Sequence, residues 1–189
     1  GAIAISSRPR PRTSQSQTPA DLACVLPWGA QLGEAPVWDP ATRSLYWVDI
    51  LHPAVYRFDP SSGLNETCET GKLVSSVMPC ADGSLAVATQ DGIEFLDFAS
   101  GALQPLVDPE AGIPENRLND AKVGPGGAIW VGSMRLDASK PSGALYRVAA
   151  DGTVTRKESG ISVSNGMAWS PDNRVFYFVD TVPGLIYAY

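Results

Sequence analysis

Three side chains that could contact a small polar ligand stand close together in the middle of the chain. Arg117, Asn119 and Asp120 fall within four positions, immediately before a run that is typical of a strand. A guanidinium group can donate paired hydrogen bonds to ligand oxygens, and amide and carboxylate oxygens can hold a hydroxyl group or a hard metal ion. Polar residues before a strand are also common turn formers, so this segment alone leaves both interpretations open.

The rest of the chain repeats one structural pattern. When Leu45, Leu85, Ile129 and Val175 are aligned, the pattern recurs at intervals of 40, 44 and 46 residues. Each unit holds three or four short β-branched or aromatic runs, separated by Gly, Pro, Asp and Asn turns. This period predicts an all-β fold of the β-propeller type with about four blades in this chain, and a β-sandwich with coincidental spacing is the alternative. Tryptophans recur within the units and are predicted to be core residues: Trp38, Trp47, Trp130 and Trp169.

Composition divides the chain into a tail and a propeller. Residues 1–20 contain three arginines, no acid and few core-forming residues, so we expect a disordered or transit-like tail, with the propeller blades in 21–189. The formal net charge of −6 over 189 residues argues against a nucleic-acid partner, which needs a basic face. No apolar run is long enough for a transmembrane helix, and unpaired strand edges could allow self-association.

The cysteines show no metal-ligand spacing and are odd in number. We interpret Cys24, Cys68 and Cys80 as free thiols of a reducing compartment, which favours a cytoplasmic location. The basic tail could instead be a targeting remnant.

Three blocks resemble the regucalcin–gluconolactonase family of senescence-marker-protein type. They are LGEAPVW at 32–38, RLNDAK at 117–122 and SNGMAWS at 164–170, and the resemblance extends over residues 32–189. It implies a six-bladed propeller with one divalent metal ion (Ca²⁺, Zn²⁺, Mn²⁺ or Mg²⁺) in its central channel. The implied activity is hydrolysis of sugar lactones, in which the metal polarises the lactone carbonyl and activates water.

The resemblance also assigns roles to individual residues. Glu34 and Asn165 correspond to metal ligands, and Asn119 to a residue that faces both metal and substrate. Arg117 and Asp137 correspond to substrate contacts. Because the innermost strand of each propeller blade lines the channel, residues just before the main strand of each unit should converge there. Their carboxylate and amide oxygens suit a hard divalent ion.

Each assignment has a simpler alternative. Glu34 could be a solvated residue at the start of a strand, and the pair Asn165 and Gly166 is also typical of a type I′ hairpin turn. Asp120 could brace its own loop, and His52 is expected in an exposed turn rather than in a catalytic role.

The chain also departs from the family pattern. Ala121, Gly124 and Ser133 replace the family's usual Gly, Asp and Thr. The family's third metal ligand, an Asp that would act as general base, is expected beyond Tyr189. The catalytic residue is therefore not assigned, and whether these 189 residues form an active enzyme stays open. The alternatives are a non-catalytic propeller fragment that binds a cation or a protein partner, and a related propeller esterase or phosphotriesterase.

Overall fold

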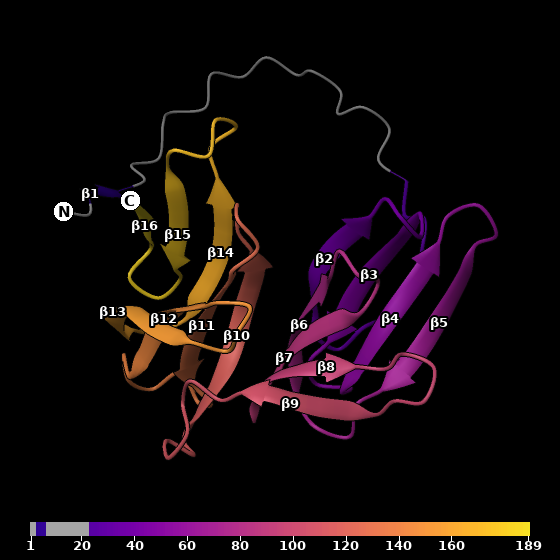
Figure 1. Ribbon diagram of the computed structural model, residues 1–189, viewed down its shortest axis with the longest axis horizontal. Coiled ribbons are helices and arrows are strands. Elements are labelled where there is room, and N and C mark those ends of the chain that lie inside the picture. The colour runs from indigo at the N-terminus through magenta and orange to yellow at the C-terminus, as the bar shows by residue number, and fades with distance from the viewer. Residues whose placement is uncertain (1–2, 7–22) are drawn as a thin grey trace.

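The computed structural model describes residues 3–6 and 23–189, and every regular element in them is a β-strand (Figure 1). The strands form four antiparallel sheets of four strands each, which we call blades 1 to 4. Blade 1 contains β2 (Gly33–Asp39), β3 (Ser44–Asp49), β4 (Ala54–Asp59) and β5 (Leu64–Glu69). Blade 2 contains β6 (Val74–Pro79), β7 (Leu85–Thr89), β8 (Gly92–Leu96) and β9 (Leu103–Val107). Blade 3 contains β10 (Asn116–Val123), β11 (Ile129–Arg135), β12 (Gly143–Val148) and β13 (Val154–Ile161). Blade 4 contains β14 (Ser164–Trp169), β15 (Phe176–Asp180), β16 (Leu185–Ala188) and β1 (Ile3–Ser6).

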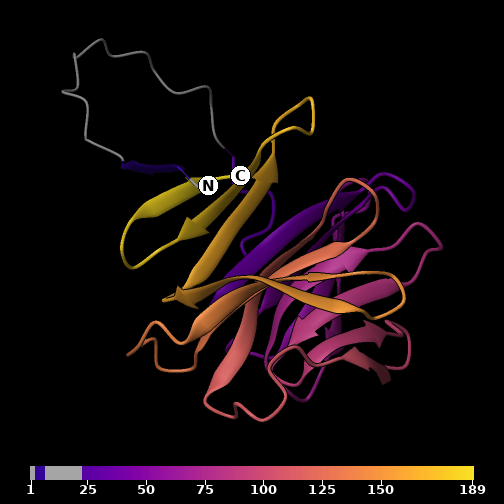
Figure 2. The same cartoon turned by 60° about the vertical axis from the view of Figure 1, so that its left-hand side comes forward.

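The first strand of each sequence unit is its innermost strand. β6 packs against β2 and β10, and β10 also packs against β14, so the innermost strands are neighbours in chain order. Figures 1 and 2 show the blades following one another from the purple β2 to the yellow β16. The predicted all-β propeller with about four blades is therefore confirmed.

The hydrophobic core lies between the blades rather than within them. Tyr46 and Val48 of blade 1 pack with Val87 of blade 2, and the interfaces between blades 2 and 3 and between blades 3 and 4 are built in the same way. Because blade 2 is covered on both faces, all residues of β7 are buried and the strand shows no alternation. In β15, exposed Tyr177 lies between buried Phe176 and Phe178, which is typical of a sheet with one covered face.

Some details differ from the sequence-based expectations. The innermost strand of blade 2, β6, was not predicted, because two polar residues interrupt its hydrophobic run. Trp38 is 49% exposed, so its prediction as a core residue is wrong, whereas Trp47 is only 9% exposed and stacks on Tyr56. The two residues point to the same face of blade 1, because Trp38 pairs with Leu45, two residues before Trp47. Leu26 and Tyr56 pack with Trp47 on that face, whereas Trp38 is left half exposed.

The predicted N-terminal tail is not without structure throughout. Its segment β1 pairs antiparallel with β16, so that Ile3 lies opposite Ala188 and Ser6 opposite Leu185. This pairing provides hydrogen-bond partners for the edge of β16. The rest of the predicted tail lies outside the described residues. Among residues 3–6 and 23–189, no helix has the length and hydrophobicity needed to cross a membrane.

Candidate functional site

Every innermost strand carries a β-bulge near its beginning. In blade 1 the register between β2 and β3 shifts after Glu34, and in blade 4 the register between β14 and β15 shifts after Asn165. Blades 2 and 3 have the corresponding shift in β6 and β10. A bulge interrupts the ladder and re-aims the side chain beside it. We call this place the bulge position, and its occupants in blades 1 to 4 are Glu34, Ser75, Asn119 and Asn165.

Three of the residues predicted from the sequence to bind metal thus occupy the same place in three blades. The segment around Asn119 was expected to precede a strand, but it lies inside β10, where the bulge interrupts the pairing. Asn165 and Gly166 lie inside β14 and do not form a hairpin turn. Gly166 has a φ of 51° and Ala35, which follows Glu34, has a φ of 49°, so both bulges use the left-handed region directly after the bulge position.

Ser75 is the member of this set that sequence reasoning missed. It stands ten residues before the aligned Leu85, as Asn119 stands ten residues before Ile129 and Asn165 before Val175. Extending the alignment of the repeats upstream would have found it. The Ser75 hydroxyl donates to the carbonyl oxygen of Asn119 at 2.8 Å, so it braces the neighbouring bulge.

The side chain of Asn119 is held from two sides. Arg117 Nη1 donates to Asn119 Oδ1 at 2.6 Å, and Asn119 Nδ2 donates to the carbonyl oxygen of Ser164 at 2.7 Å. Asn119 is 9% exposed, so both polar ends of its amide are satisfied within the protein. The second bond links β10 to β14, and it brings Asn119 next to Ser164, the residue that precedes Asn165.

Blade 2 holds the backbone of the same bulge. The Ser76 hydroxyl donates to the Asn119 carbonyl at 3.1 Å and accepts from the backbone N–H of Ala121 at 3.0 Å. Ser76 is fully buried. The bulge in β10 is therefore bonded to blade 2 on one side and to blade 4 on the other.

Charged groups from different blades influence one another at the site. Burial lowers the pKa of Arg117, and the nearby Glu34 carboxylate opposes that shift. Burial also raises the pKa of Asp120, against the Lys122 charge and the backbone N–H groups of Ala121 and Gly166. Glu34 of blade 1 is thus close enough to Arg117 of blade 3 for their charges to interact.

Asp137 lies apart from this group. It follows β11 in an exposed loop, where its carboxylate forms an ion pair with Arg135 Nε at 3.0 Å and accepts from the N–H of Ser139 at 3.0 Å. Within the described part of the chain, no hydrogen bond or ion pair connects Asp137 to Arg117 or Asn119. His52 is exposed in the turn after β3, as expected.

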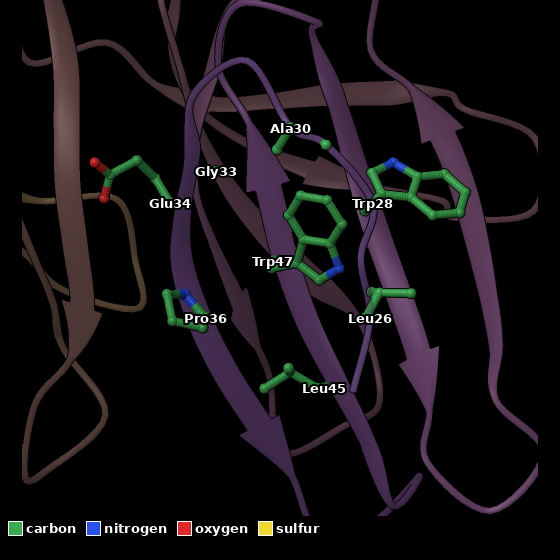
Figure 3. A pocket seen from close by; sticks show the side chains of 9 residues that line it. Leu26, Trp28, Ala30, Gly33, Glu34, Pro36, Leu45 and Trp47 are labelled. Atoms are coloured by element: carbon green, nitrogen blue, oxygen red, sulfur yellow. The ribbon is translucent and has the colours of Figure 1, made fainter. Parts of the chain in front are cut away.

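An apolar pocket of about 310 Å³ lies on blade 1. Trp28, Leu26 and Trp47 line it, and in Figure 3 the Glu34 carboxylate points away from the two tryptophans. Glu34 is nevertheless one of the lining residues, so the pocket borders the bulge position of blade 1.

The oxygen donors at the bulge positions fit a hard divalent cation. Glu34 supplies a carboxylate, and Asn119 and Asn165 supply amide oxygens, which are ligands that Ca²⁺, Mg²⁺ and Mn²⁺ accept. Among the described residues, no three His, Cys, Asp or Glu side chains form a metal-binding group, so amide oxygens are needed to complete any such set.

Several known proteins are similar to this chain in sequence and in fold. The family model described as "SMP-30/Gluconolactonase/LRE-like region" matches residues 32–189. Regucalcin of Danio rerio is 33% identical over 88% of this chain and 57% of its own length. Pentonolactonase XacC of Haloferax volcanii is 34% identical over 87% of this chain and 55% of its own length.

Solved structures agree with these sequence matches. The crystal structure of a calcium-binding protein, regucalcin, from Agrobacterium tumefaciens is 34% identical, with a TM-score of 0.76 over 80% of this chain and 51% of that one. The chain therefore spans little more than half the length of the relatives it matches. The match over residues 32–189 confirms the resemblance in the sequence, and the chain belongs to the SMP-30/gluconolactonase/LRE-like family.

Proposed function

We propose that the chain takes part in metal-dependent hydrolysis of sugar lactones, with the bulge positions holding the cation. The observation that carries this proposal is that Glu34, Asn119 and Asn165 occupy one equivalent place on three innermost strands. The substrate class is supported by the pentonolactonase among the relatives, and the class of ion by the calcium-binding regucalcin.

The proposed cation ligands are Glu34, Asn165 and Asn119. The Oδ1 atom of Asn119 accepts one hydrogen bond from Arg117, and an amide oxygen has a second lone pair that remains for an ion. Asn165 Oδ1 accepts only a 3.2 Å bond from the N–H of Gly166, so it also keeps acceptor capacity. A divalent cation bound there would act as a Lewis acid toward a lactone carbonyl and would lower the pKa of water.

Arg117 is the proposed substrate-binding group. Within the described residues its hydrogen bonds come from Nη1, so Nη2 and Nε are available to hydroxyl or carbonyl oxygens of a sugar lactone. Because Arg117 is largely buried, a hydrogen bond to substrate is made in a site of low dielectric constant and is stronger than in water.

Asp137 is proposed as a second substrate contact on the basis of the family resemblance. Its side chain is 59% exposed, and its partner Arg135 is bound at one oxygen, so the carboxylate can still accept from a sugar hydroxyl group.

Lactone hydrolysis by the purified chain tests the proposal. The rate of acid release from D-glucono-δ-lactone would be followed in a pH-stat with Ca²⁺, Mn²⁺ or Zn²⁺ and again with EDTA. We expect a metal-dependent rate that Glu34→Ala and Asn165→Ala abolish. Glu69→Ala is the matched control, because Glu69 is exposed on the outermost strand of the same blade as Glu34.

The other outcomes separate the alternative functions. A folded protein that binds the cation but gives no hydrolysis would be a cation-binding module. Hydrolysis of an aryl ester or a phosphotriester in preference to the lactone would indicate an esterase or a phosphotriesterase.

A further inference from the structure

One buried carboxylate in each blade lies near the beginning of the innermost strand. The four are between 2% and 6% exposed, and they are Asp49, Glu94, Glu110 and Asp180. A buried carboxylate is costly unless hydrogen-bond donors or positive charges surround it. The partners of these four groups therefore show what the carboxylates hold in place.

The carboxylate of Asp49 binds the backbone just before Glu34. Its oxygens accept from the N–H groups of Gln31 at 2.7 Å and Leu32 at 3.0 Å, and two further N–H groups come from the turn after β3. Gln31 and Leu32 stand three and two residues before Glu34.

Asp180 does the same in blade 4. It accepts from the N–H groups of Ser162 at 3.0 Å and Val163 at 2.9 Å. These residues stand three and two positions before Asn165, which is the same spacing as in blade 1. In both blades the Asp lies opposite the residue that precedes the bulge position, since Asp49 pairs with Gly33 and Asp180 with Ser164.

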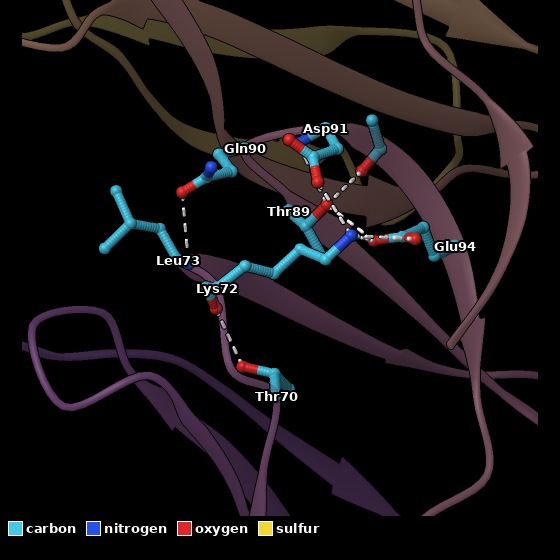
Figure 4. A network of polar contacts seen from close by, with 8 residues as sticks. Thr70, Lys72, Leu73, Thr89, Gln90, Asp91 and Glu94 are labelled. Carbon is cyan, nitrogen blue, oxygen red and sulfur yellow. Dashed lines mark hydrogen bonds and ion pairs between the residues drawn. The ribbon is translucent and has the colours of Figure 1, made fainter. Parts of the chain in front are cut away.

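In blade 2 a buried carboxylate also holds the segment before the bulge position, but through different side chains. Thr89 stands where blades 1 and 4 have Asp, and its hydroxyl donates to Glu94 Oε2 at 2.8 Å. Lys72, three residues before Ser75, reaches Glu94 at 3.2 Å, and Figure 4 shows its ammonium group between Glu94 and Asp91.

In blade 3 the carboxylate comes from a loop. Ser133 takes the place of the Asp and donates to Glu110 Oε1 at 2.6 Å. Asn116, three residues before Asn119, donates from Nδ2 to Glu110 Oε2 at 2.7 Å. All four blades therefore fix the third residue before the bulge position with a buried carboxylate.

We propose that Asp49 and Asp180 are positioning residues, which set the orientation of Glu34 and Asn165 toward the bound cation. This inference rests on the proposed function. Each Asp fixes the backbone upstream of the bulge, and the pairing with β3 or β15 fixes it downstream, so the residue between them has one direction available. Without the upstream bonds, the bulge can relax and the ligand oxygen moves away from the ion.

The test measures Mn²⁺ affinity by isothermal titration calorimetry on the chain and on Asp49→Asn, Asp180→Asn, Glu94→Gln and Glu34→Ala. Asn has nearly the same shape as Asp but presents an amide N–H₂ to the backbone donors. We expect Asp49→Asn and Asp180→Asn to weaken Mn²⁺ binding about 10–100-fold, as is usual when a residue that orients a metal ligand is removed. Glu94→Gln is the matched control, because Glu94 serves blade 2, where the bulge position holds Ser75.

Folding is followed in parallel by urea denaturation, since the variants of Asp49, Asp180 and Glu94 each remove a buried charge. If Asp49→Asn does not fold, Asp49→Glu keeps the charge and displaces the oxygens, and the same loss of affinity is expected. Mn²⁺ affinity that is unchanged in the Asp variants, or reduced equally in Glu94→Gln, would overturn the positioning role. Loss of binding in Glu34→Ala with binding in the unmodified chain would show that the metal site itself stands, whereas an unmodified chain that does not bind Mn²⁺ would overturn both proposals.

Discussion

The side-chain amide of Asn119 donates to the backbone carbonyl of Ser164 at 2.7 Å, which connects the innermost strands of blades 3 and 4. The bond joins a proposed ligand to the residue next to another proposed ligand, Asn165. A change at Ser164 is therefore transmitted to two of the three oxygen donors at once.

Gly132→Ala tests this connection. A Cβ atom at position 132 would lie 1.5 Å from the hydroxyl oxygen of Ser164 and 2.3 Å from its Cβ atom, so Ser164 must shift. We expect a loss of about 1–3 kcal/mol in the free energy of unfolding, measured in urea, together with weaker Mn²⁺ binding. Gly33→Ala is the milder control, because the nearest atom to its added Cβ is 3.3 Å away. Equal Mn²⁺ affinity in Gly132→Ala and the unmodified chain would contradict the connection.

Arg117→Lys is expected to impair lactone hydrolysis more than it impairs folding. Lysine cannot reproduce the fork of N–H donors, so one hydrogen bond to substrate or to Asn119 Oδ1 is lost. A hydrogen bond from a charged group is worth about 1.5–3 kcal/mol, which lowers kcat/KM about 10- to 150-fold. The same substitution at Arg156, which is exposed on the outermost strand of blade 3, should leave kcat/KM unchanged.

Ser76→Ala removes a buried hydroxyl that serves two backbone groups. The N–H of Ala121 would lose its partner, and the Asn119 carbonyl would keep only the bonds from other donors. We expect the free energy of unfolding to fall by about 1–3 kcal/mol in urea denaturation. Ser61→Ala, in an exposed turn, should change it by no more than about 0.5 kcal/mol. A Ser76→Ala protein as stable as the unmodified chain would show that the Ser76 hydroxyl does not support the bulge in β10.

The stability contributed by Asp49 should depend on pH in a defined direction. Burial tends to raise the pKa of Asp49, but its four backbone N–H partners outweigh that effect and the pKa is lowered. Above the unfolded-state pKa of about 3.9 its contribution is fully present, and it is lost as the pH falls through the lower folded-state pKa. Asp49→Asn should therefore cost about 2–3 kcal/mol at pH 7 and progressively less below about pH 4.

Urea denaturation between pH 2.5 and 7, at roughly half-unit steps, measures this difference. The exposed Asp151→Asn serves as the comparison, because a substitution in a solvent-exposed turn should change stability much less than one at a buried carboxylate. A cost for Asp49→Asn that stays constant or grows toward acid pH would mean that the carboxylate is not stabilised in the folded protein.

The periodicity of the sequence was sufficient to predict the blades, because turns and β-branched runs are local features. It did not reveal β6, in which Ser75 and Ser76 face the bulge of β10 instead of the interblade core. The exposure of Trp38 could not be predicted either, because other side chains cover Trp47 and leave Trp38 half exposed on the same face of blade 1, and that depends on tertiary structure.

The candidate site was predicted in part. Glu34, Asn119 and Asn165 were found from their residue types and from the family resemblance, whereas their common bulge was not. A bulge is defined by the register between two strands, and the sequence of one short segment does not determine that register. The buried carboxylates were missed for a similar reason, since Asp49 and Glu110 serve equivalent places from unrelated positions in their units.

The four bulge positions occupy one equivalent place on the innermost strands but carry three different residue types, Glu, Ser and Asn. Main-chain pairing and the buried carboxylates hold the strand on both sides of that place, and neither depends on the side chain at the bulge position. Single substitutions at the bulge positions can therefore change the number and the charge of the side-chain oxygen atoms, while the pairing of the strands is retained. If the proposed cation site is correct, its preference for an ion or a substrate could change during evolution through such substitutions while the protein stays folded.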